Sequence, residues 1–302
     1  MSGATGIRAP LIRELGPGDE TALEAFLARH ADSSMFLRAS LRRGGLGSGD
    51  TPDHGRYLAS VAGRGAGADV TGVIAIYANG NVVVQAPGDA AALARALAAQ
   101  GLHQAIGFVG PAAQVAAIRP ALAPRNRALL KDSLEILFAL GLERLVIPPL
   151  LARGDATARR ARAADFDLLV RWRTDYMVDT LGIRGGPELM ARARADMTER
   201  LDVTWLLEAG GEPLACQSFN ASLPDIVQVG GVWTPPGLRG RGYARAVVAG
   251  ALRDVRGGGV RRGVLFTGSD NVPAQRAYRA IGFTPIGDYA LVQYGEPYPA
   301  DR

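Results

Sequence analysis

The same order of sequence features occurs twice along this chain of 302 residues. Each copy has a short apolar segment, a polar turn, a helical pattern, a hairpin, a proline, a helix, a short strand that ends in glycine, and a last helix. The first hairpin joins residues 72–78 and 81–85 through an Asn-Gly turn. The second joins residues 213–220 and 226–232. Two copies of one plan predict a tandem duplication.

The duplication divides the chain into two predicted domains, residues 1–152 and residues 158–302. Their connection contains Pro148, Pro149 and the arginine-rich residues 153–162, which we interpret as a solvated linker. Each half has about the length of one ordinary domain. Because helices must cover a sheet with both antiparallel and parallel neighbours, the predicted fold class is mixed α/β. Each half is expected to have a mostly antiparallel sheet flanked by helices.

An aspartate stands where the first helix of each copy is expected to begin. Asp19 precedes the helical pattern of the first half, and Asp165 precedes its counterpart in the second. A short carboxylate at this position can accept hydrogen bonds from the free amides of the first helical turn. We therefore expect both aspartates to be N-caps.

Composition excludes several classes of protein. With 48% hydrophobic and 21% charged residues, each half can bury a core, and disorder is not expected. The net charge is +5, but Lys131 is the only lysine and no basic run of the nucleic-acid-binding kind is present. We expect no nucleic-acid partner. Because no apolar stretch is long enough to cross a bilayer and no signal peptide is apparent, we expect a cytoplasmic protein without a membrane partner.

The sequence offers no metal site. The single cysteine, Cys216, excludes an intrachain disulfide and a zinc site made of several thiolates. The histidines, His30, His54 and His103, are scattered without the spacing of metal ligands. We therefore expect no bound metal.

The second half contains a strand, a glycine-rich loop and a helix in direct succession. The strand ends at Pro235 and Pro236, because proline cannot donate to a continuing ladder. Glycines allow several loop amides to converge, and the helix dipole adds about half a positive charge at the helix start. The pattern predicts an anion site at Arg239, Gly240, Arg241, Gly242, Tyr243 and Ala244.

Two other phosphate-binding motifs fit this loop less well. The Gly-Lys-Ser/Thr sequence of a P-loop is absent. A dinucleotide fingerprint would require glycine or alanine where Arg245 stands. An ordinary tight turn between strand and helix remains the alternative for the loop taken alone.

Two segments of the second half resemble the signatures of the GNAT N-acetyltransferase superfamily. The loop resembles the family's pyrophosphate-binding motif as Arg239-x-x-Gly242-x-Ala244. The preceding segment resembles the family's splayed strand, at Val232-x-Thr234-x-Pro236. The second signature follows in the right order, at Asn271, Ala274, Tyr278, Gly282 and Phe283. The resemblance covers residues 160–295, and the first half resembles only a degenerate copy.

The resemblance implies two tandem acyl-CoA N-acyltransferase-like domains, of which only the second is catalytic. It implies transfer of an acetyl group from acetyl-CoA to a primary amine through a ternary complex, with an acceptor whose identity the sequence leaves open. The alternative is a non-catalytic acetyl-CoA-binding or sensor protein. By resemblance the cofactor contacts are Val232, Trp233, Thr234, Arg239, Gly240, Arg241, Gly242, Tyr243, Ala244, Asn271, Ala274 and Tyr278.

Thioester aminolysis also requires a proton for the departing thiolate. Tyr278 follows Asn271 by two helical turns, so both side chains share one face of the expected helix. A tyrosine hydroxyl, with an ordinary pKa near 10, can donate to a thiolate. By resemblance, Tyr278 is the general acid and Asn271 binds the CoA arm. The alternative is that Tyr278 is a core aromatic residue.

The sequence leaves the general base open. By resemblance a glutamate belongs on the strand that leads to the splay, but the chain has Gln228 there, which cannot take a proton. Asp225, three residues earlier, is the predicted base, with a solvated turn aspartate and a water chain as the alternatives. Weaker candidates are Glu208, Asp175 and Tyr176. Trp172 and Trp233 are expected to be core or wall residues.

The first half lacks the glycine-rich loop. The segment Ala86-Pro87-Gly88-Asp89 occupies the corresponding position, and the carboxylate of Asp89 would repel a phosphate. We therefore predict that the first half is non-catalytic and that one chain binds one CoA.

Overall fold

The protein is described here from a computed structural model, which covers residues 11–47, 49, 53–63, 69–101, 105–180 and 186–297. His103 lies outside the described residues. By its contacts the chain divides into two compact units. The first runs to Leu134 and resumes at Asp288, and the second is Glu135–Gly287.

The expected elements occur in the expected order, and each unit has in addition a second helix and a strand before its hairpin and one long strand after its last helix. Those that precede or cross the boundary at Leu134 are β1 (Leu11–Glu14), α1 (Glu20–Arg29), α2 (Met35–Gly44), β2 (Gly55–Ala62), β3 (Asp69–Tyr77), β4 (Asn81–Gln85), α3 (Ala90–Ala99), β5 (Gly107–Pro111), α4 (Ala112–Leu122) and β6 (Arg127–Gly141). Those that follow are α5 (Pro149–Ala152), β7 (Thr157–Arg160), α6 (Phe166–Asp179), α7 (Pro187–Arg200), β8 (Thr204–Ala209), β9 (Glu212–Ser222), β10 (Ile226–Trp233), α8 (Tyr243–Gly257), β11 (Arg262–Gly268), α9 (Val272–Arg279) and β12 (Thr284–Pro297).

The two units have the same sheet topology. In the first unit the strand order is β1-β2-β3-β4-β5-β12, and among its described strand pairs only β4 and β5 run parallel. In the second unit the order is β7-β8-β9-β10-β11-β6, and β10 and β11 are the corresponding parallel pair. Both predicted hairpins are present, as β3–β4 and β9–β10. The predicted mixed α/β fold class is confirmed.

The strand beside the parallel pair comes from a distant part of the sequence in each unit. In the first unit, β5 pairs with β12, the last strand of the chain. In the second unit, β11 pairs with residues 135–141 of β6, which directly follow the first unit in the sequence. The units therefore differ from the ranges 1–152 and 158–302 that the sequence predicts as domains. Local sequence patterns do not reveal which strand will complete which sheet.

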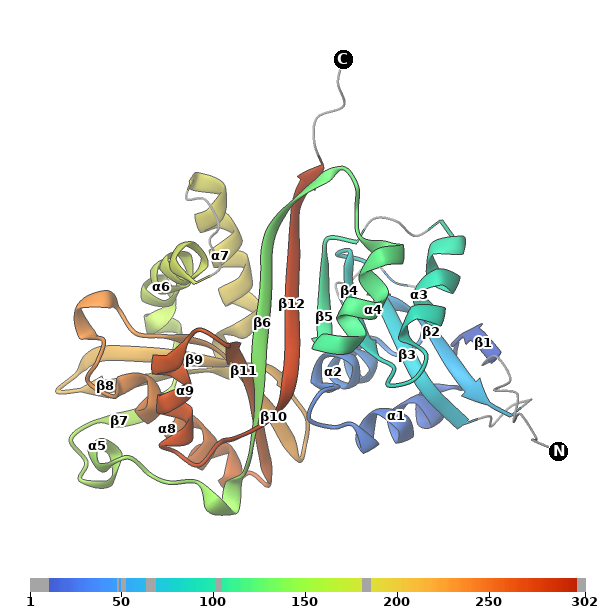
Figure 1. Ribbon diagram of the computed structural model, residues 1–302. Helices are drawn as coiled ribbons and strands as arrows, with labels where there is room; N and C mark the ends of the chain where they lie inside the picture. Colours follow the sequence, from blue (N-terminus) through green and yellow to red (C-terminus); the bar gives the residue numbers. More distant parts are fainter. Residues whose placement is uncertain are drawn as a thin grey trace. The chain divides into compact units, whose positions relative to one another are not determined.

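Helices cover both faces of the sheet in each unit. In the second unit, the core on one face joins the sheet to α8 and α9, and the core on the other face joins it to α6 and α7. Figure 1 shows these two helix pairs on opposite sides of the strands β8 to β11. The first unit repeats the arrangement, with α3 and α4 on one face and α1 and α2 on the other. The buried faces of these helices are aliphatic, and such a core drives folding through loss of apolar surface.

An arginine–aspartate pair recurs at the same place in both units. Arg13 donates two hydrogen bonds of 2.7 Å to the carboxylate of Asp19. Arg159 donates bonds of 2.7 and 3.0 Å to the carboxylate of Asp165. In each pair the aspartate is the sixth residue after the arginine, and the backbone amide three residues before the aspartate donates to its Oδ2. The repeated geometry supports a tandem duplication more directly than the sequence pattern does.

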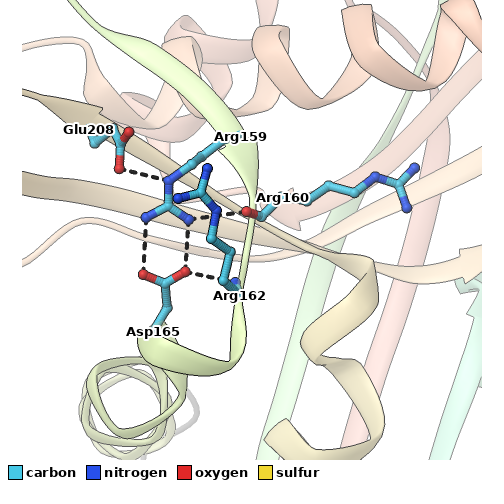
Figure 2. Close-up of polar contacts among 5 residues, drawn as sticks. All are labelled: Arg159, Arg160, Arg162, Asp165 and Glu208. Atoms are coloured by element: carbon cyan, nitrogen blue, oxygen red, sulfur yellow. Dashed lines mark hydrogen bonds and ion pairs between the residues drawn. The ribbon is translucent and has the colours of Figure 1, made fainter. Parts of the chain in front are cut away.

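The role expected for these two aspartates was wrong. Both stand at the N-cap position of α1 or α6, but neither side chain accepts a hydrogen bond from its helix. The carboxylate of Asp165 instead faces Arg159, whose Nε also donates to Glu208 on β8 over 2.7 Å (Figure 2). A bidentate bond to a charged guanidinium is stronger than a capping bond to a neutral amide. The pair thereby joins the start of α6 to the edge of the sheet.

Replacing Asp165 by asparagine should destabilise the protein by about 1.5–3 kcal/mol at neutral pH, the usual range for hydrogen bonds to charged groups. Both side chains are largely buried, with exposed fractions of 20% for Arg159 and 14% for Asp165. The guanidinium of Arg159 lowers the pKa of Asp165, so its stabilisation is complete above the ordinary aspartate pKa of about 3.9 and is lost as the pH falls below it. Urea unfolding at several pH values measures both effects.

The matched control is Asp155→Asn, which removes an ion pair with Arg153 whose side chains are 46% and 66% exposed. Such exposed pairs contribute little. An equal loss of stability in both variants would contradict the structural role assigned to the Arg159–Asp165 pair.

Candidate active site

The strands β10 and β11 of the second unit separate part-way along their length. They pair in parallel at Ile226, Val227 and Gln228, and no further pair joins them among the described residues. Beyond this point β10 stays paired with β9 as far as Trp233, and β11 stays paired with β6 as far as Gly268. The two facing backbone edges are therefore left without ladder partners. We call this opening the splay.

Two glycines shape the β10 side of the splay. The register between β10 and β9 shifts between Gly230 and Trp233, so β10 has one extra residue there. Gly231 adopts a φ of +56°, a left-handed conformation that favours glycine. A bulge of this kind bends and twists its strand. The pair Gly230-Gly231 is thus a local cause of the separation from β11.

The glycine-rich loop lies between β10 and α8. Gly240 and Gly242 have φ values of +79° and +81°, and Gly242 is the N-cap of α8. A Cβ at position 242 would displace the flexible side chain of Arg245, whose Nε lies 2.9 Å away, and any other residue would be strained by the left-handed conformation. The first amides of a helix have no acceptor within the helix and attract anions. The loop therefore has free backbone amides at the position where the sequence predicts an anion site.

Three arginines surround the loop. Arg239 donates from Nε to the carbonyl of Thr234 over 3.0 Å and forms an ion pair of 2.7 Å with Asp179 at the end of α6. That pair is about half exposed, so it contributes little and a phosphate could replace the carboxylate. Arg241 and Arg245 have no ion pair within the part of the chain that the structure describes. Positive charge is therefore available at the predicted anion site.

Helix α9 carries the residues of the second sequence signature. The side chain of Asn271 caps this helix by accepting from the amide of Ala274 over 3.2 Å. Tyr278 is buried, with an exposed fraction of 8%, and its ring contacts Phe283 edge to face. Its hydroxyl has no hydrogen bond to any described residue. The ring of Tyr278 is thus part of the core, while its hydroxyl makes no hydrogen bond to a described residue.

Tyr278 and Tyr176 approach each other from opposite faces of the sheet. Tyr278 belongs to α9, while Tyr176 belongs to α6. Burial is the main cause that raises the pKa of Tyr278, and the neighbouring Tyr176 raises it further. Burial also raises the pKa of Tyr176. Both phenols therefore remain protonated at neutral pH and can donate protons.

A small pocket lies on the face of the second unit that α6 and α7 cover. Its lining includes Trp172, Tyr176 and Trp233, and the two last rings meet edge to face with centroids 6.3 Å apart. Gly231 also lines it, so the pocket adjoins the bulge of β10. The side chain of Trp233 is thus a wall of this pocket, as expected for a wall residue. Its backbone belongs to the splayed edge of β10.

The thiol of Cys216 lines the same pocket. Burial raises its pKa to about 12. The thiol is therefore neutral at physiological pH, and a thiol is a far weaker nucleophile than a thiolate. A covalent acyl-cysteine intermediate does not fit this site.

The candidates for the general base are not brought together at the splay. Asp225 is exposed at the first end of β10, where its carbonyl accepts from the amides of Arg261 and Arg262, whereas the splay opens toward the other end of the strand. Glu208 is held by Arg159, and Asp175 is exposed on α6. Gln228 is buried, and its Oε1 has no partner among the described residues.

Sequence reasoning missed one carboxylate, Glu135. It lies on β6, opposite Gly268 in the ladder with β11, and only 4% of it is exposed. Its charge contributes to the raised pKa of Tyr176, so the two side chains are within electrostatic range. The sequence division had assigned Glu135 to the first half. Glu135 shares one face of the strand with Leu137 and Ala139, because every second residue of a strand points the same way. This apolar spacing is the sequence signal that could have predicted an inward-facing Glu135.

The corresponding place in the first unit is closed. The strands β4 and β5 pair in parallel as far as Val83 and Val109, and only Val84 and Gln85 of β4 lie beyond that pair. A Cβ on Gly110 would lie 2.8 Å from the carbonyl oxygen of Val84, so the two backbones remain close. The amide of Ala86, which follows β4, donates to the side chain of Gln114 over 2.6 Å. This unit offers no splay like that of the second.

The sequence predicts neither a metal site nor a membrane-spanning segment. Within the described residues, no group of three or more His, Cys, Asp or Glu side chains is placed to hold a metal ion. His30 instead packs against the ring of Phe26 at 5.0 Å. No described helix combines the length and the apolar character that crossing a membrane would require.

Comparison with known proteins agrees with this geometry. Residues 167–283 match the model of the acetyltransferase (GNAT) family. The second unit carries a GNAT domain. The matched region contains the three parts of the candidate site, which are the splay, the glycine-rich loop and the helix of Tyr278.

Curated relatives match only part of the chain. Mycothiol acetyltransferase from Beutenbergia cavernae is 34% identical over 95 residues, which are 31% of this chain and 31% of that protein. The enzyme of the same name from Corynebacterium glutamicum is 31% identical over 100 residues, or 33% of this chain and 34% of that protein. The match thus spans about a third of these relatives, and their substrate does not transfer to this chain.

Solved structures resemble the chain over nearly its whole length. A Drosophila protein covers 95% of this chain and 99% of its own, with a TM-score of 0.64 and 13% identity. A tandem GNAT protein from the clavulanic acid biosynthesis pathway covers 96% and 99%, with a TM-score of 0.52 and 15% identity. At such low identity the likeness concerns the fold alone, and that fold is a tandem GNAT fold.

Replacing Gly242 by valine should weaken CoA binding at least about tenfold, equivalent to about 1.4 kcal/mol. Valine cannot easily adopt the left-handed conformation of position 242, so the amides at the start of α8 would be displaced. The control is Gly237→Val in the same segment, where a Cβ meets open space and φ is not positive. Calorimetry measures both affinities and should give one site per wild-type chain, because the first unit lacks the splay. Unchanged affinity in folded Gly242→Val, or two equivalent sites, would contradict this assignment.

Proposed function

We propose that this protein transfers the acetyl group of acetyl-CoA to a primary amine while both substrates are bound together. The observation that carries the proposal is the splay, which has the anion-binding loop of the GNAT domain after β10 and Tyr278 on the neighbouring helix α9. Bound acetyl-CoA would supply an acetyl group activated as a thioester. The neutral thiol of Cys216 supports direct transfer to the amine, without an acyl-enzyme.

The cofactor would be held mainly by backbone groups. The amides at the start of α8, with Arg239 and Arg241, would bind the pyrophosphate. The free edge of β10 at Val232 and Thr234 would pair with the extended arm, in the way that an added strand pairs with a sheet edge. Asn271 and Ala274, at the start of α9, would contact the arm from the other side. An unpaired backbone edge inside a domain needs such a partner, because buried amides and carbonyls are costly when left unsatisfied.

Two side chains would move the protons of the reaction. The amine nitrogen forms a bond to the acetyl carbon and loses a proton, while the carbon–sulfur bond breaks and the thiolate gains one. Tyr278 is the proposed donor to sulfur, because its pKa is raised and its hydroxyl is free of other described partners. Glu135 replaces Asp225 as the proposed acceptor of the amine proton, directly or through water. It is a carboxylate beside the splayed strand β11, whereas Asp225 is exposed at the far end of β10.

The reaction itself is tested by following free thiol release from acetyl-CoA in the presence of a panel of amines, with CoA binding measured in parallel. Turnover that depends on the amine supports the proposal. Binding of acetyl-CoA without transfer to any amine would favour the alternative, a sensor that binds the cofactor and has no activity.

Tyr278→Phe should lower turnover by about 10²–10⁴-fold, the usual value of general acid catalysis, and barely change CoA affinity. The substitution removes one hydroxyl and keeps the ring that packs against Phe283. Because a general acid acts when protonated and the pKa of Tyr278 is raised, wild-type turnover should show no loss attributable to this group below about pH 10. A pH–rate profile of the variant and the wild type checks both points. Full turnover in Tyr278→Phe would reduce Tyr278 to a packing residue.

Glu135→Gln should lower turnover by about 10²–10⁴-fold, because an amide cannot accept the amine proton. The matched control is Asp225→Asn, which changes an exposed carboxylate at the other end of β10 and should leave turnover unaltered. Loss of turnover in Asp225→Asn but not in Glu135→Gln would restore the assignment made from the sequence. Far-ultraviolet circular dichroism and CoA affinity report whether each variant is folded.

A further inference from the structure

Two arginines line the pocket on the α6 and α7 face of the second unit. Arg173 belongs to α6, and Arg200 is the last residue of α7. Their side chains are only 17% and 21% exposed. Arginine remains charged even when buried, and a buried charge is costly unless an anion accompanies it. The chemistry of this pocket therefore depends on which anions accompany the two guanidinium groups.

Only one carboxylate is shared between the two arginines in the described part of the pocket. Asp196 on α7 lies 2.6 Å from Nε of Arg173 and 4.0 Å from Nε of Arg200. Arg200 also donates from Nη2 to the neutral side chain of Asn220 over 2.6 Å. Both Nη groups of Arg173 and Nη1 of Arg200 have no hydrogen bond to a described residue. The arginines therefore retain donors that neither Asp196 nor Asn220 engages.

A third donor of the same pocket also lacks a partner. Trp233 is 4% exposed, and its Nε1 has no hydrogen bond within the described part of the chain. A buried donor left unsatisfied costs about 1–3 kcal/mol, so an acceptor atom supplied by a ligand would be stabilising there. The pocket measures about 20 Å³, room for a group about the size of a water molecule. It suits one small end of a ligand rather than a whole molecule.

We propose that Arg173 and Arg200, with Trp233, form a subsite for a carboxylate carried by the acceptor, so that the amine substrate is a small amino acid or another amine that bears a carboxylate. This inference rests on the acetyl transfer proposed above. A carboxylate is planar and accepts two parallel hydrogen bonds from a guanidinium, which matches the free donors better than a neutral amide does. Glu135 is not among the lining residues, but it lies within electrostatic range of Tyr176, which is one of them. An amino acid would place its two charged ends against groups of opposite sign.

Burial lowers the pKa of Arg200, which is the direction expected for a guanidinium whose charge is incompletely compensated. The nearby carboxylate of Asp196 opposes that shift, and Tyr176 and the carboxylate of Glu199 oppose it to a smaller extent, whereas the guanidinium of Arg173 adds to it. An anionic ligand would relieve the mutual repulsion of the two arginines. Binding of a neutral amine would leave that repulsion in place.

The test compares kcat/KM, expressed per unprotonated amine, for amino acids with that for their carboxamides, using glycine and glycinamide, L-alanine and L-alaninamide, and β-alanine and β-alaninamide. O-phosphoethanolamine with ethanolamine is a fourth pair. We expect the wild-type protein to prefer the carboxylates. Equal use of acid and amide would overturn the proposal, and so would turnover confined to the phosphate-bearing amine.

Substitutions then locate the preference. Arg200→Gln and Arg173→Gln should each lower the acid-to-amide ratio by about 10- to 100-fold, the range for a hydrogen bond to a charged group. Asp196→Asn should raise the ratio, because it removes the competing carboxylate. The matched control is Arg194→Gln, whose guanidinium lies on the same helix α7 and pairs with Asp167 at the exposed surface. Using the ratio cancels the different intrinsic basicity of the two amines, so an unchanged ratio in all three pocket variants would contradict the subsite.

Binding separates failure of the subsite from failure of the enzymatic proposal. Calorimetry with N-acetylglycine and N-acetylglycinamide is carried out on the full chain saturated with CoA. Selective binding of the acid, weakened in Arg200→Gln, supports the subsite even when no amine of the panel is acetylated. Equal or absent binding of acid and amide, in a protein that binds CoA and acetylates amines, would reject the carboxylate subsite alone.

Discussion

The loss of backbone pairing between β10 and β11 after Gln228 is the constraint on which the candidate site depends. Hydrogen bonding across a sheet normally leaves no room for a ligand, and an open edge within a domain leaves amides and carbonyls that need partners. The bulge at Gly230 and Gly231 turns β10 aside while its bonds to β9 persist. On the other side, β6 keeps β11 in place up to Gly268. The opening is thus held on both sides by intact sheet.

Helices on the two faces give this opening two different environments. On one face, α8 presents its first amides at Gly242, and α9 brings Tyr278 into the apolar core. On the other face, α6 and α7 enclose a pocket with two partly buried arginines and the indole of Trp233. Tyr176 raises the pKa of Tyr278 although their helices cover opposite faces, which is consistent with the lack of a strand pair between them. An acyl donor and an amine could therefore approach one point from different sides.

The two units share one plan, but among the described residues only the second has the opening between its parallel strands. Both units have a parallel strand pair, helix pairs on the two faces and the same bidentate pair, Arg13–Asp19 or Arg159–Asp165. These features maintain the shared fold. In the first unit the strands β4 and β5 stay close at Gly110, and the amide of Ala86 donates a hydrogen bond to the side chain of Gln114. The site therefore depends on a few local departures from a plan that both units share.

The sequence by itself determined the order of elements, both hairpins, the mixed α/β class and the position of the glycine-rich loop, because each depends on residues close together in the chain. Turn residues, hydrophobic alternation and glycines that need a positive φ are local properties. Only the tertiary structure decided which distant strand completes each sheet, and it thereby brought Glu135 beside β11 while leaving Asp225 at the exposed end of β10. It also turned the carboxylates of Asp19 and Asp165 from helix caps into arginine partners, and it gathered Arg173 and Arg200 around one pocket. These outcomes depend on pairing and packing between residues far apart in the chain, which no local pattern records.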